Sequence, residues 1–253
     1  MTFKSTTKLT LRSALFLLLF SYHPASANFY CYRNPPGHKH PNGGGYVADT
    51  AYVDKYAYIA PGVSVCDRAQ IHGAVFVSGF SEITHDAMIV QEGDGEIAIT
   101  GNVIIRGRAQ VRGMVRISGD AEIRGDAKVL DWAHITGAAD IGGNVTIKDW
   151  ALISGNGYFY DKAIISGWAK VTGDADIGGQ AQISEHAQVL GPSSIRDTVQ
   201  INGSARIFGG PVICGELVIT RDITGNEDPK TLCKSSGREM SAHHNRAFQT
   251  KYL

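Results

Sequence analysis

The three tryptophans of the chain, Trp132, Trp150 and Trp168, recur at an 18-residue spacing. Hydroxyl side chains keep the same spacing four positions further on: Thr136, Ser154 and Thr172. Side chains that recur at the period of a structural repeat lie in one line on its surface. Indoles beside hydroxyl groups suit the faces and hydroxyls of a polysaccharide or another extended partner. The alternative is that the indoles stack on one another and only shield a corner.

A second candidate surface contains Tyr158 and Tyr160. Gly142 and Gly178 flank Tyr160 at the 18-residue spacing, which leaves room for its ring to lie flat and accept the face of a sugar. The column of Tyr158 is otherwise acidic: Glu122, Asp140 and Asp176. Like charges in one column repel, and a bound cation would relieve the repulsion. A solvated surface without a ligand is the alternative.

Acid–base and metal chemistry have less support in the sequence. The central histidines are His72, His85, His134 and His186. A site built from His85 and Asp86 beside an interruption of the repeat at 91–96 would suit acyl transfer, which needs a histidine base. Further histidines lie near the ends, where they could pair on a metal: His38, His40, His243 and His244. The acidic cluster of Glu92, Asp94 and Glu96 matches no calcium loop. We therefore assign no catalytic residue, no metal and no cofactor, and we lean towards a non-catalytic protein.

A six-residue repeat positions all of these side chains. Every sixth residue from Ile99 to Ile219 is Ile or Val, with the single exception of Phe159, and a shifted frame runs from Val47 to Ile89. Two residues after each aliphatic position, over the twenty hexads that start at Ile99 to Ile213, stand fifteen Gly, four Asp and one Glu. Alternation within each hexad favours a short strand, and the Gly or Asp indicates a turn with a left-handed or cramped backbone. The 18-residue ladders then predict three strands per coil around an Ile/Val interior.

The motifs IRGDAKV, ISGWAKV and INGSARI resemble the hexapeptide-repeat, left-handed parallel β-helix superfamily, and the I-x-G-x-A-x variant is similar to its YdcK-like branch. The usual unit places Gly one residue after the aliphatic position, whereas here it comes two residues after. The resemblance covers about Val47 to Thr220 and implies an all-β, three-sided, left-handed parallel β-helix with about 18 residues per coil and irregular N- and C-terminal caps. The superfamily includes acyltransferases, carbonic anhydrase-like enzymes, ice-binding proteins and non-catalytic scaffolds, so function stays open.

The beginning of the chain resembles an export signal. Basic residues precede an apolar run at Ala14–Phe20, and small residues at 25–27 supply a cleavage site. The run is too short to cross a bilayer as a helix, and we expect no membrane span. Export favours a secreted or periplasmic location, where four cysteines can pair: Cys31, Cys66, Cys214 and Cys233. Pairing 31 with 66 and 214 with 233 would tie each end to the nearest coils, but the sequence leaves all three connectivities open.

These observations divide the chain into a signal peptide (1–27), an N-terminal cap segment (28–45), a β-helix (46–220) with a small loop insertion at 91–96, and a C-terminal cap or tail (221–253). Coil ends that the caps leave open would form homo-oligomers. Basic and acidic residues balance at 24 each, so no nucleic-acid partner is indicated.

The preferred hypothesis is an exported, non-catalytic binding or structural protein whose flat faces contact glycan or another envelope polymer. The first alternative is a hexapeptide acyltransferase-like enzyme that works as a trimer. The second alternative is a secreted host-interaction protein.

Overall fold

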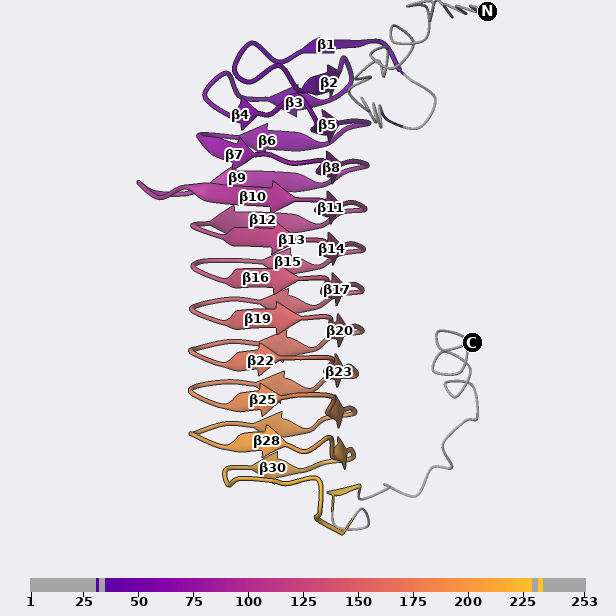
Figure 1. Ribbon diagram of the computed structural model, residues 1–253, viewed down its shortest axis with the longest axis vertical. Helices are drawn as coiled ribbons and strands as arrows, with labels where there is room; N and C mark the ends of the chain where they lie inside the picture. Colours follow the sequence, from indigo (N-terminus) through magenta and orange to yellow (C-terminus); the bar gives the residue numbers. More distant parts are fainter. Residues whose placement is uncertain (1–30, 32–34, 229–231, 234–253) are drawn as a thin grey trace, which may run out of the picture.

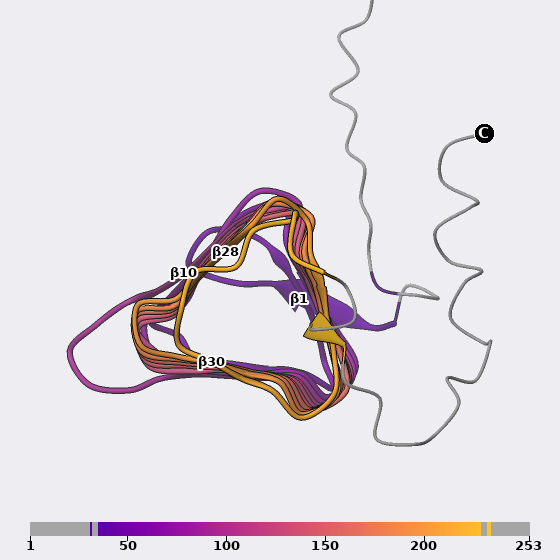
Figure 2. The ribbon, with the colours of Figure 1, turned by 90° about the horizontal axis from the view of Figure 1, so that it is seen from below.

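A computed structural model describes residues 31, 35–228 and 232–233. Over these residues the chain forms 30 short strands that wind into a three-sided solenoid (Figures 1 and 2). Seen along its axis, the coils superimpose as a triangle with an enclosed interior (Figure 2). The expected all-β, three-sided coil is confirmed.

Each side of the triangle is one sheet, and the sheets follow one another in the order A, B, C along every coil. Sheet A has 11 strands: β1 (Gly37–Lys39), β2 (Tyr46–Ala48), β5 (Ser64–Val65), β8 (Glu82–Ile83), β11 (Ile104–Ile105), β14 (Glu122–Ile123), β17 (Asp140–Ile141), β20 (Tyr158–Phe159), β23 (Asp176–Ile177), β26 (Ser194–Ile195) and β29 (Val212–Ile213). Sheet B has 10 strands: β3 (Tyr52–Val53), β6 (Gln70–His72), β9 (Met88–Gln91), β12 (Gln110–Gly113), β15 (Lys128–Val129), β18 (Thr146–Ile147), β21 (Ile164–Ile165), β24 (Gln182–Ile183), β27 (Gln200–Ile201) and β30 (Val218–Ile219). Sheet C has nine strands: β4 (Tyr58–Ile59), β7 (Val75–Val77), β10 (Ile97–Gly101), β13 (Arg116–Gly119), β16 (His134–Gly137), β19 (Leu152–Gly155), β22 (Lys170–Thr172), β25 (Gln188–Leu190) and β28 (Arg206–Phe208).

The register between coils follows the repeat. Ile99 lies opposite Ile117, which is the predicted 18-residue step, and the same step recurs down the solenoid. Between β7 and β10 the chain takes a 22-residue step instead, because Ile99 lies opposite Val77. The additional residues form a loop between β9 and β10 that projects from the corner of sheets B and C (Figure 2).

The interior is filled by the periodic aliphatic side chains. Every Ile or Val of the repeat from Ile99 to Ile213 is fully buried, as are the alanines four residues after them. Phe159, the single aromatic residue in this series, fits because Gly157 leaves space beside its ring. Each buried Ile or Val contributes about 1.5–3 kcal/mol before chain entropy is subtracted.

The corners of the triangle carry the predicted left-handed residues. All twenty residues that follow the aliphatic positions by two have a positive φ, whether they are Gly, Asp or Glu. At the corner between sheets C and A, every one of these residues is glycine from Gly101 to Gly209. There, a Cβ on Gly137 would lie 2.5 Å from the carbonyl oxygen of Gly155, so that a side chain would collide with the next coil. Close stacking of coils therefore requires glycine at this corner in addition to the left-handed backbone.

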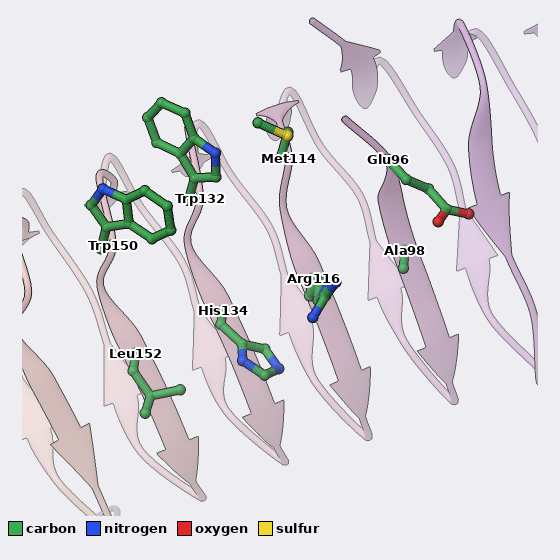
Figure 3. Close-up of a pocket in the computed structure, with 8 residues that line it drawn as sticks. All are labelled: Glu96, Ala98, Met114, Arg116, Trp132, His134, Trp150 and Leu152. Atoms are coloured by element: carbon green, nitrogen blue, oxygen red, sulfur yellow. The ribbon is translucent and has the colours of Figure 1, made fainter. Parts of the chain in front are cut away.

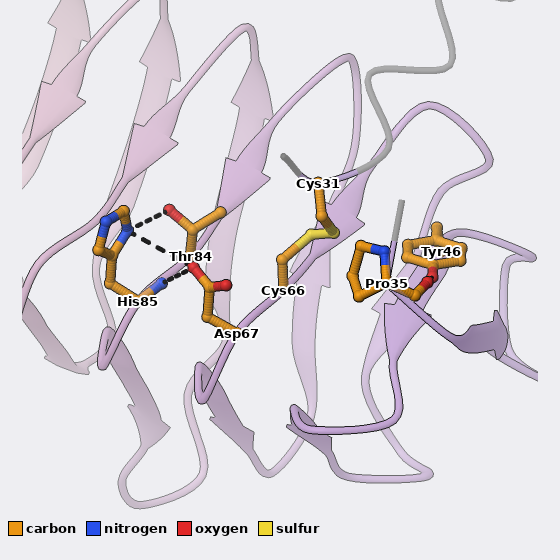
Figure 4. The surroundings of a disulfide bond; sticks show 7 residues. All are labelled: Cys31, Pro35, Tyr46, Cys66, Asp67, Thr84 and His85. Carbon is orange, nitrogen blue, oxygen red and sulfur yellow. Dashed lines mark hydrogen bonds and ion pairs between the residues drawn. A yellow bond between two sulfur atoms is a disulfide. The ribbon is translucent and has the colours of Figure 1, made fainter. Parts of the chain in front are cut away.

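The N-terminal end is covered by the segment before the repeat. β1 pairs antiparallel with β2 and covers the edge of sheet A. The backbone N–H of Ile59 donates to Asn42 (3.0 Å), and its carbonyl accepts from Gly45 (2.8 Å), which covers the edge of sheet C. Cys31 is buried and forms a disulfide with Cys66 (Figure 4).

The C-terminal end is covered in a similar way. Phe208 and Cys214 donate backbone hydrogen bonds to Ile223 (3.0 Å) and Leu232 (2.8 Å), which lie across the last strands of sheets C and A. A disulfide joins Cys214 to Cys233. The two bonds select one of the three connectivities that the sequence left open, the one in which each end is tied to its nearest coil.

Some predictions fall outside the described residues. These are the signal peptide (1–27), His243 and His244, and most of the C-terminal tail. Among the residues that the structure describes, no helix has the length and apolar character needed to cross a bilayer.

Candidate binding face

The three tryptophans form a continuous ladder at the corner between sheets B and C. The ring centroids of Trp132 and Trp150 are 4.8 Å apart, those of Trp150 and Trp168 are 4.9 Å apart, and the planes of each pair deviate by 4° and 2°. The imidazole of His186 continues the stack below Trp168 at 6.5 Å. Since the indoles are still 43%, 46% and 56% exposed, stacking leaves about half of each side chain at the surface. The ladder thus shields the corner and also leaves indole surface exposed.

A shallow hollow of about 430 Å³ opens beside this ladder on sheet C (Figure 3). It is lined by residues of four coils: Glu96, Ala98, Met114, Arg116, Trp132, His134, Trp150 and Leu152. The hollow exists because Ala98 lies between the much larger Phe76 and Arg116 in the register of sheet C. The hollow was not predicted from the sequence. It becomes visible in the sequence only when the outward residues of sheet C are aligned across the 22-residue step between β7 and β10.

The imidazole of His134 lies inside the hollow, half-buried between Arg116 and Leu152 (Figure 3). Burial and the positive charge of Arg116 hold the pKa of His134 below its usual value. His134 is therefore predominantly neutral near neutral pH and presents one hydrogen-bond donor and one acceptor.

The hydroxyl ladder lies on the same face, closer to the corner with sheet A. Thr136 pairs with Ser154, and Ser154 with Thr172, so the three hydroxyl groups form a column that is partly exposed. The hydroxyl of Thr136 donates to the carbonyl of Ile153 at 3.4 Å. Four residues along a strand separate this column from the tryptophans, or about 13 Å at the usual rise. The two ladders therefore border the face on opposite sides.

The tyrosine surface lies on sheet A, on a different side of the triangle. The ring of Tyr160 lies over Gly178, where a Cβ would overlap it, and the guanidinium group of Arg124 lies 2.9 Å from where a Cβ of Gly142 would be. The flat ring of Tyr160 therefore has one face against the backbone. Its partial burial and its hydrogen bond to Asp176 raise the pKa of Tyr160 to about 12.

Arginines, and not a cation site, compensate the acidic column of sheet A. Arg124 donates to Asp140 at 2.9 and 3.1 Å. Asp176 accepts from Arg196 at 3.2 Å, and Glu122 pairs with Arg106, whose Nε lies 2.8 Å away. The hypothesis of a bound cation is therefore unnecessary. Its premise, uncompensated repulsion, does not hold, because each carboxylate has a guanidinium partner in the adjacent column.

The structure does not bring His85 together with the loop. His85 occupies the corner between sheets A and B at a φ of 62°, whereas the loop leaves the corner between sheets B and C, at the far end of β9. Its backbone N–H donates to Asp67 (3.0 Å), and its ring hydrogen-bonds with the hydroxyl of Thr84 at 2.9 Å (Figure 4). The neighbouring Asp86 is held by Arg68 at 2.7 Å, which keeps its pKa below the usual value. The structure therefore excludes a His85–Asp86 site beside the loop, because the two lie at opposite ends of one side of the triangle.

Three other described histidines contact neighbouring residues of the fold. His40 is buried and hydrogen-bonds with the backbone of Asn42. His38 lies 3.4 Å from Asp49, and His72 hydrogen-bonds with Gln70. Within the described ranges, no group of three or more His, Cys, Asp or Glu side chains is arranged to hold a metal.

The acidic residues at the corners have a role that the sequence analysis did not recognise. The carboxylate of Asp149 accepts the backbone N–H of Gly167, one coil further on, at 2.9 Å, and that of Glu185 accepts from Gly203 at 2.7 Å. The same contact joins Asp131 to Asp149, Asp161 to Gly179, Asp197 to Gly215 and Asp67 to His85. These carboxylates satisfy backbone donors at the turns, as N-cap residues do in helices. The 18-residue spacing of such pairs is the sequence signal for this contact.

No protein-family model and no curated protein sequence matches the chain. The architecture, a parallel β-solenoid with an 18-residue turn, is compatible with the β-helix superfamily to which the repeat points. Function is therefore inferred from the side chains on the face of sheet C.

Proposed function

We propose that this protein is an exported, non-catalytic binding or structural protein, and that the face of sheet C beside the tryptophan ladder holds an extended polymer such as a glycan of the cell envelope. The observation that carries the proposal is the exposed stack of Trp132, Trp150 and Trp168 at the margin of the hollow.

The periodicity of the face favours a polymer over a small molecule. Coils repeat at about 4.8 Å, the spacing of strands in a sheet. An extended polymer whose monomers repeat at a similar distance meets the same kind of side chain once per monomer. The hollow alone is too open to enclose a small ligand, since its floor is the flat outer surface of sheet C (Figure 3).

The chemistry of the face suits a carbohydrate. Apolar indole surface receives the C–H face of a sugar, while hydroxyl and imidazole groups exchange hydrogen bonds with its polar rim. Trp150, His134 and Thr136 supply these three kinds of group within two adjacent coils. A rigid scaffold loses little conformational entropy when it binds, which favours affinity.

Export is part of the proposal. The two disulfides are consistent with an oxidising compartment, in which such bonds persist. They also tie both ends of the solenoid, where coils lack a neighbour on one side.

Retention on an array of envelope glycans, or on insoluble cell-wall polysaccharide, tests the proposal. Wild-type protein should be retained, and Trp150→Ala should weaken retention about tenfold, because stacking on an aromatic ring contributes about 0.5–1.5 kcal/mol beyond burial. Phe80→Ala is the matched control, since Phe80 is an aromatic residue on another corner and is at least as exposed (59%) as Trp150 (46%). Equal retention of Trp150→Ala and wild type would remove the tryptophan ladder from the site.

A second candidate function rests on one observation, the neutral His134 inside the hollow. An acyltransferase-like trimer needs a histidine base at the boundary between subunits. The solution mass from light scattering, together with protection of His134 from chemical modification, tests this function. A trimer that protects His134 supports the enzyme, and a monomer with an accessible His134 contradicts it.

A further inference from the structure

The central outward column of sheet C contains cations but no carboxylate. Read from the N-terminal end, it contains Tyr58, Phe76, Ala98, Arg116, His134, Leu152, Lys170, Gln188 and Arg206. Among the described residues, neither Arg116 nor Lys170 has an ion-pair or side-chain hydrogen-bond partner. Arg206 lies 5.7 Å from the ring centroid of Phe208.

Arginines without an ion-pair partner are unusual among the described residues, whereas the described lysines, Lys170 included, form no ion pair. The arginines on and beside sheet A bind carboxylates at short distances: Arg68 to Asp86, Arg106 to Glu122, Arg108 to Asp126, Arg124 to Asp140 and Arg196 to Asp176. The repeat therefore provides positions at which a carboxylate one coil away neutralises an arginine. The column of Arg116 and Lys170 does not use such positions.

The nearest acidic residues do not neutralise the column. Asp120 and Asp174 lie beyond the corner glycines, and each accepts a hydrogen bond from an asparagine: Asn102 to Asp120 at 2.7 Å, and Asn156 to Asp174 at 3.1 Å. Glu96 lies at the loop end of the hollow, in the column of the tryptophans and not in that of Arg116 (Figure 3). The flat part of the face thus presents a net positive charge between its two ladders.

We propose that the polymer bound by sheet C is an anionic polysaccharide, a glycan that carries carboxylate groups along its length. This inference rests on the proposed function and specifies its ligand. The guanidinium group of Arg116 matches a carboxylate in a two-pronged geometry, and Lys170 provides a point charge. Two residues along the strand separate the cation column from the tryptophan ladder, or about 7 Å. A sugar ring that stacks on an indole therefore directs its carboxylate towards the cations.

The spacing of the two cations requires a chain and not a single sugar. Arg116 and Lys170 are three coils apart in sheet C, or about 14 Å at the strand spacing. A monosaccharide reaches one of them. A chain with repeated carboxylates engages both, and the second contact benefits from the high local concentration that the first creates.

Polygalacturonate and its methyl-esterified form test the inference, because the two polymers share a backbone and differ in charge. Wild-type protein should bind the charged polymer more tightly, and moderate salt should weaken that preference. The double variant Arg116→Gln/Lys170→Gln should bind polygalacturonate about two- to tenfold less tightly, which two exposed ion pairs predict. It should bind the methyl-esterified polymer as wild type does.

The matched control is Arg108→Gln/Lys162→Gln, which removes the same charge from another side of the solenoid. Arg108 pairs with Asp126 and lies outside sheet C. This control should retain the wild-type preference for polygalacturonate. A shorter chain of one or two sugars should bind all three proteins equally weakly.

The outcomes separate this inference from the proposed function. Equal binding of both polymers, with loss only in Trp150→Ala, overturns the anionic ligand and leaves the glycan face in place. An equal loss in the control double variant also overturns the inference, because it would show a general effect of net charge. Absence of binding to either polymer and to every glycan on the array overturns both proposals.

Discussion

Sheets A and C have the same strand register and the same buried aliphatic column, yet their outer surfaces treat charge differently. On sheet A, the side chains of Arg124 and Arg196 fold onto carboxylates of the neighbouring column. On sheet C, Arg116 and Lys170 extend from a column in which no acid is available. The backbone is common to both faces, so the difference lies only in the outward residues.

This contrast distinguishes side chains that pair with one another within the scaffold from side chains that remain available to a partner. Salt bridges on sheet A neutralise charge within the molecule and offer little to a partner. Sheet C places half-exposed indoles, a neutral imidazole and unpaired cations next to one another. Exposed indoles can stack on a ligand, and cations without an intramolecular partner can pair with its anionic groups. We therefore propose that the outer surface of sheet A contributes to stability and that of sheet C to recognition.

The largest expected effect is a loss of stability, caused by substitution of a glycine at the corner that sheets C and A share. Gly137→Ala places a Cβ 2.5 Å from the carbonyl oxygen of Gly155 at a φ of 92°. Strain and overlap together should lower the free energy of unfolding by about 2–4 kcal/mol, which urea denaturation measures. Gly203→Asp is the control, because the corner between sheets B and C already contains aspartates such as Asp149 and the nearest atom to a Cβ on Gly203 lies 4.0 Å away. It should be nearly neutral, and an equal loss in both variants would refute the distinction between the corners.

Matched arginine substitutions test the contrast itself. Arg124→Gln leaves the mostly buried carboxylate of Asp140 without its charged partner, and should cost about 1 kcal/mol of unfolding free energy. Arg116→Gln removes a cation that has no partner in the described structure, and should change stability by less than about 0.5 kcal/mol. Denaturant unfolding of the two variants measures both values. Equal destabilisation would show that Arg116 also serves the fold.

The smallest expected effect concerns the stability of the protein at alkaline pH, to which Tyr160 on sheet A contributes. Tyr160 has a pKa of about 12, above the usual value of 10. Because the folded protein favours the neutral phenol, this contribution to stability is complete below pH 10 and is lost as the pH rises towards 12. Tyr160→Phe should therefore remove part of the decline in stability over that range. Stability measurements at a series of alkaline pH values test this, and identical slopes in wild type and Tyr160→Phe would contradict it.

The period of the sequence was sufficient to predict most of the scaffold. It placed Trp132 above Trp150, the Ile/Val column in the interior and left-handed residues at every corner, because each of these depends only on position within an 18-residue coil. The disulfide connectivity was not predictable, since it depends on how the ends return to the coils. His85 is close to the loop in sequence but not in space, because strand β9 separates the corner that contains His85 from the corner that carries the loop.

The candidate site was predictable only in part. The tryptophan and hydroxyl ladders follow from spacing alone. The hollow and the unpaired charge of Arg116 do not, because they depend on neighbours across coils. Ala98 creates space only because the loop shifts the register, and an arginine is paired or free according to which residue occupies the adjacent column.

Intrinsic fluorescence tests the central claim most directly, because the chain has three tryptophans and all of them belong to the ladder. We predict that titration with polygalacturonate shifts the indole emission to shorter wavelength and protects it from a soluble quencher, with saturation at the concentration at which binding saturates. If the polymer binds by an independent measurement and the emission and quenching of the indoles stay unchanged, the face of sheet C is not the binding face.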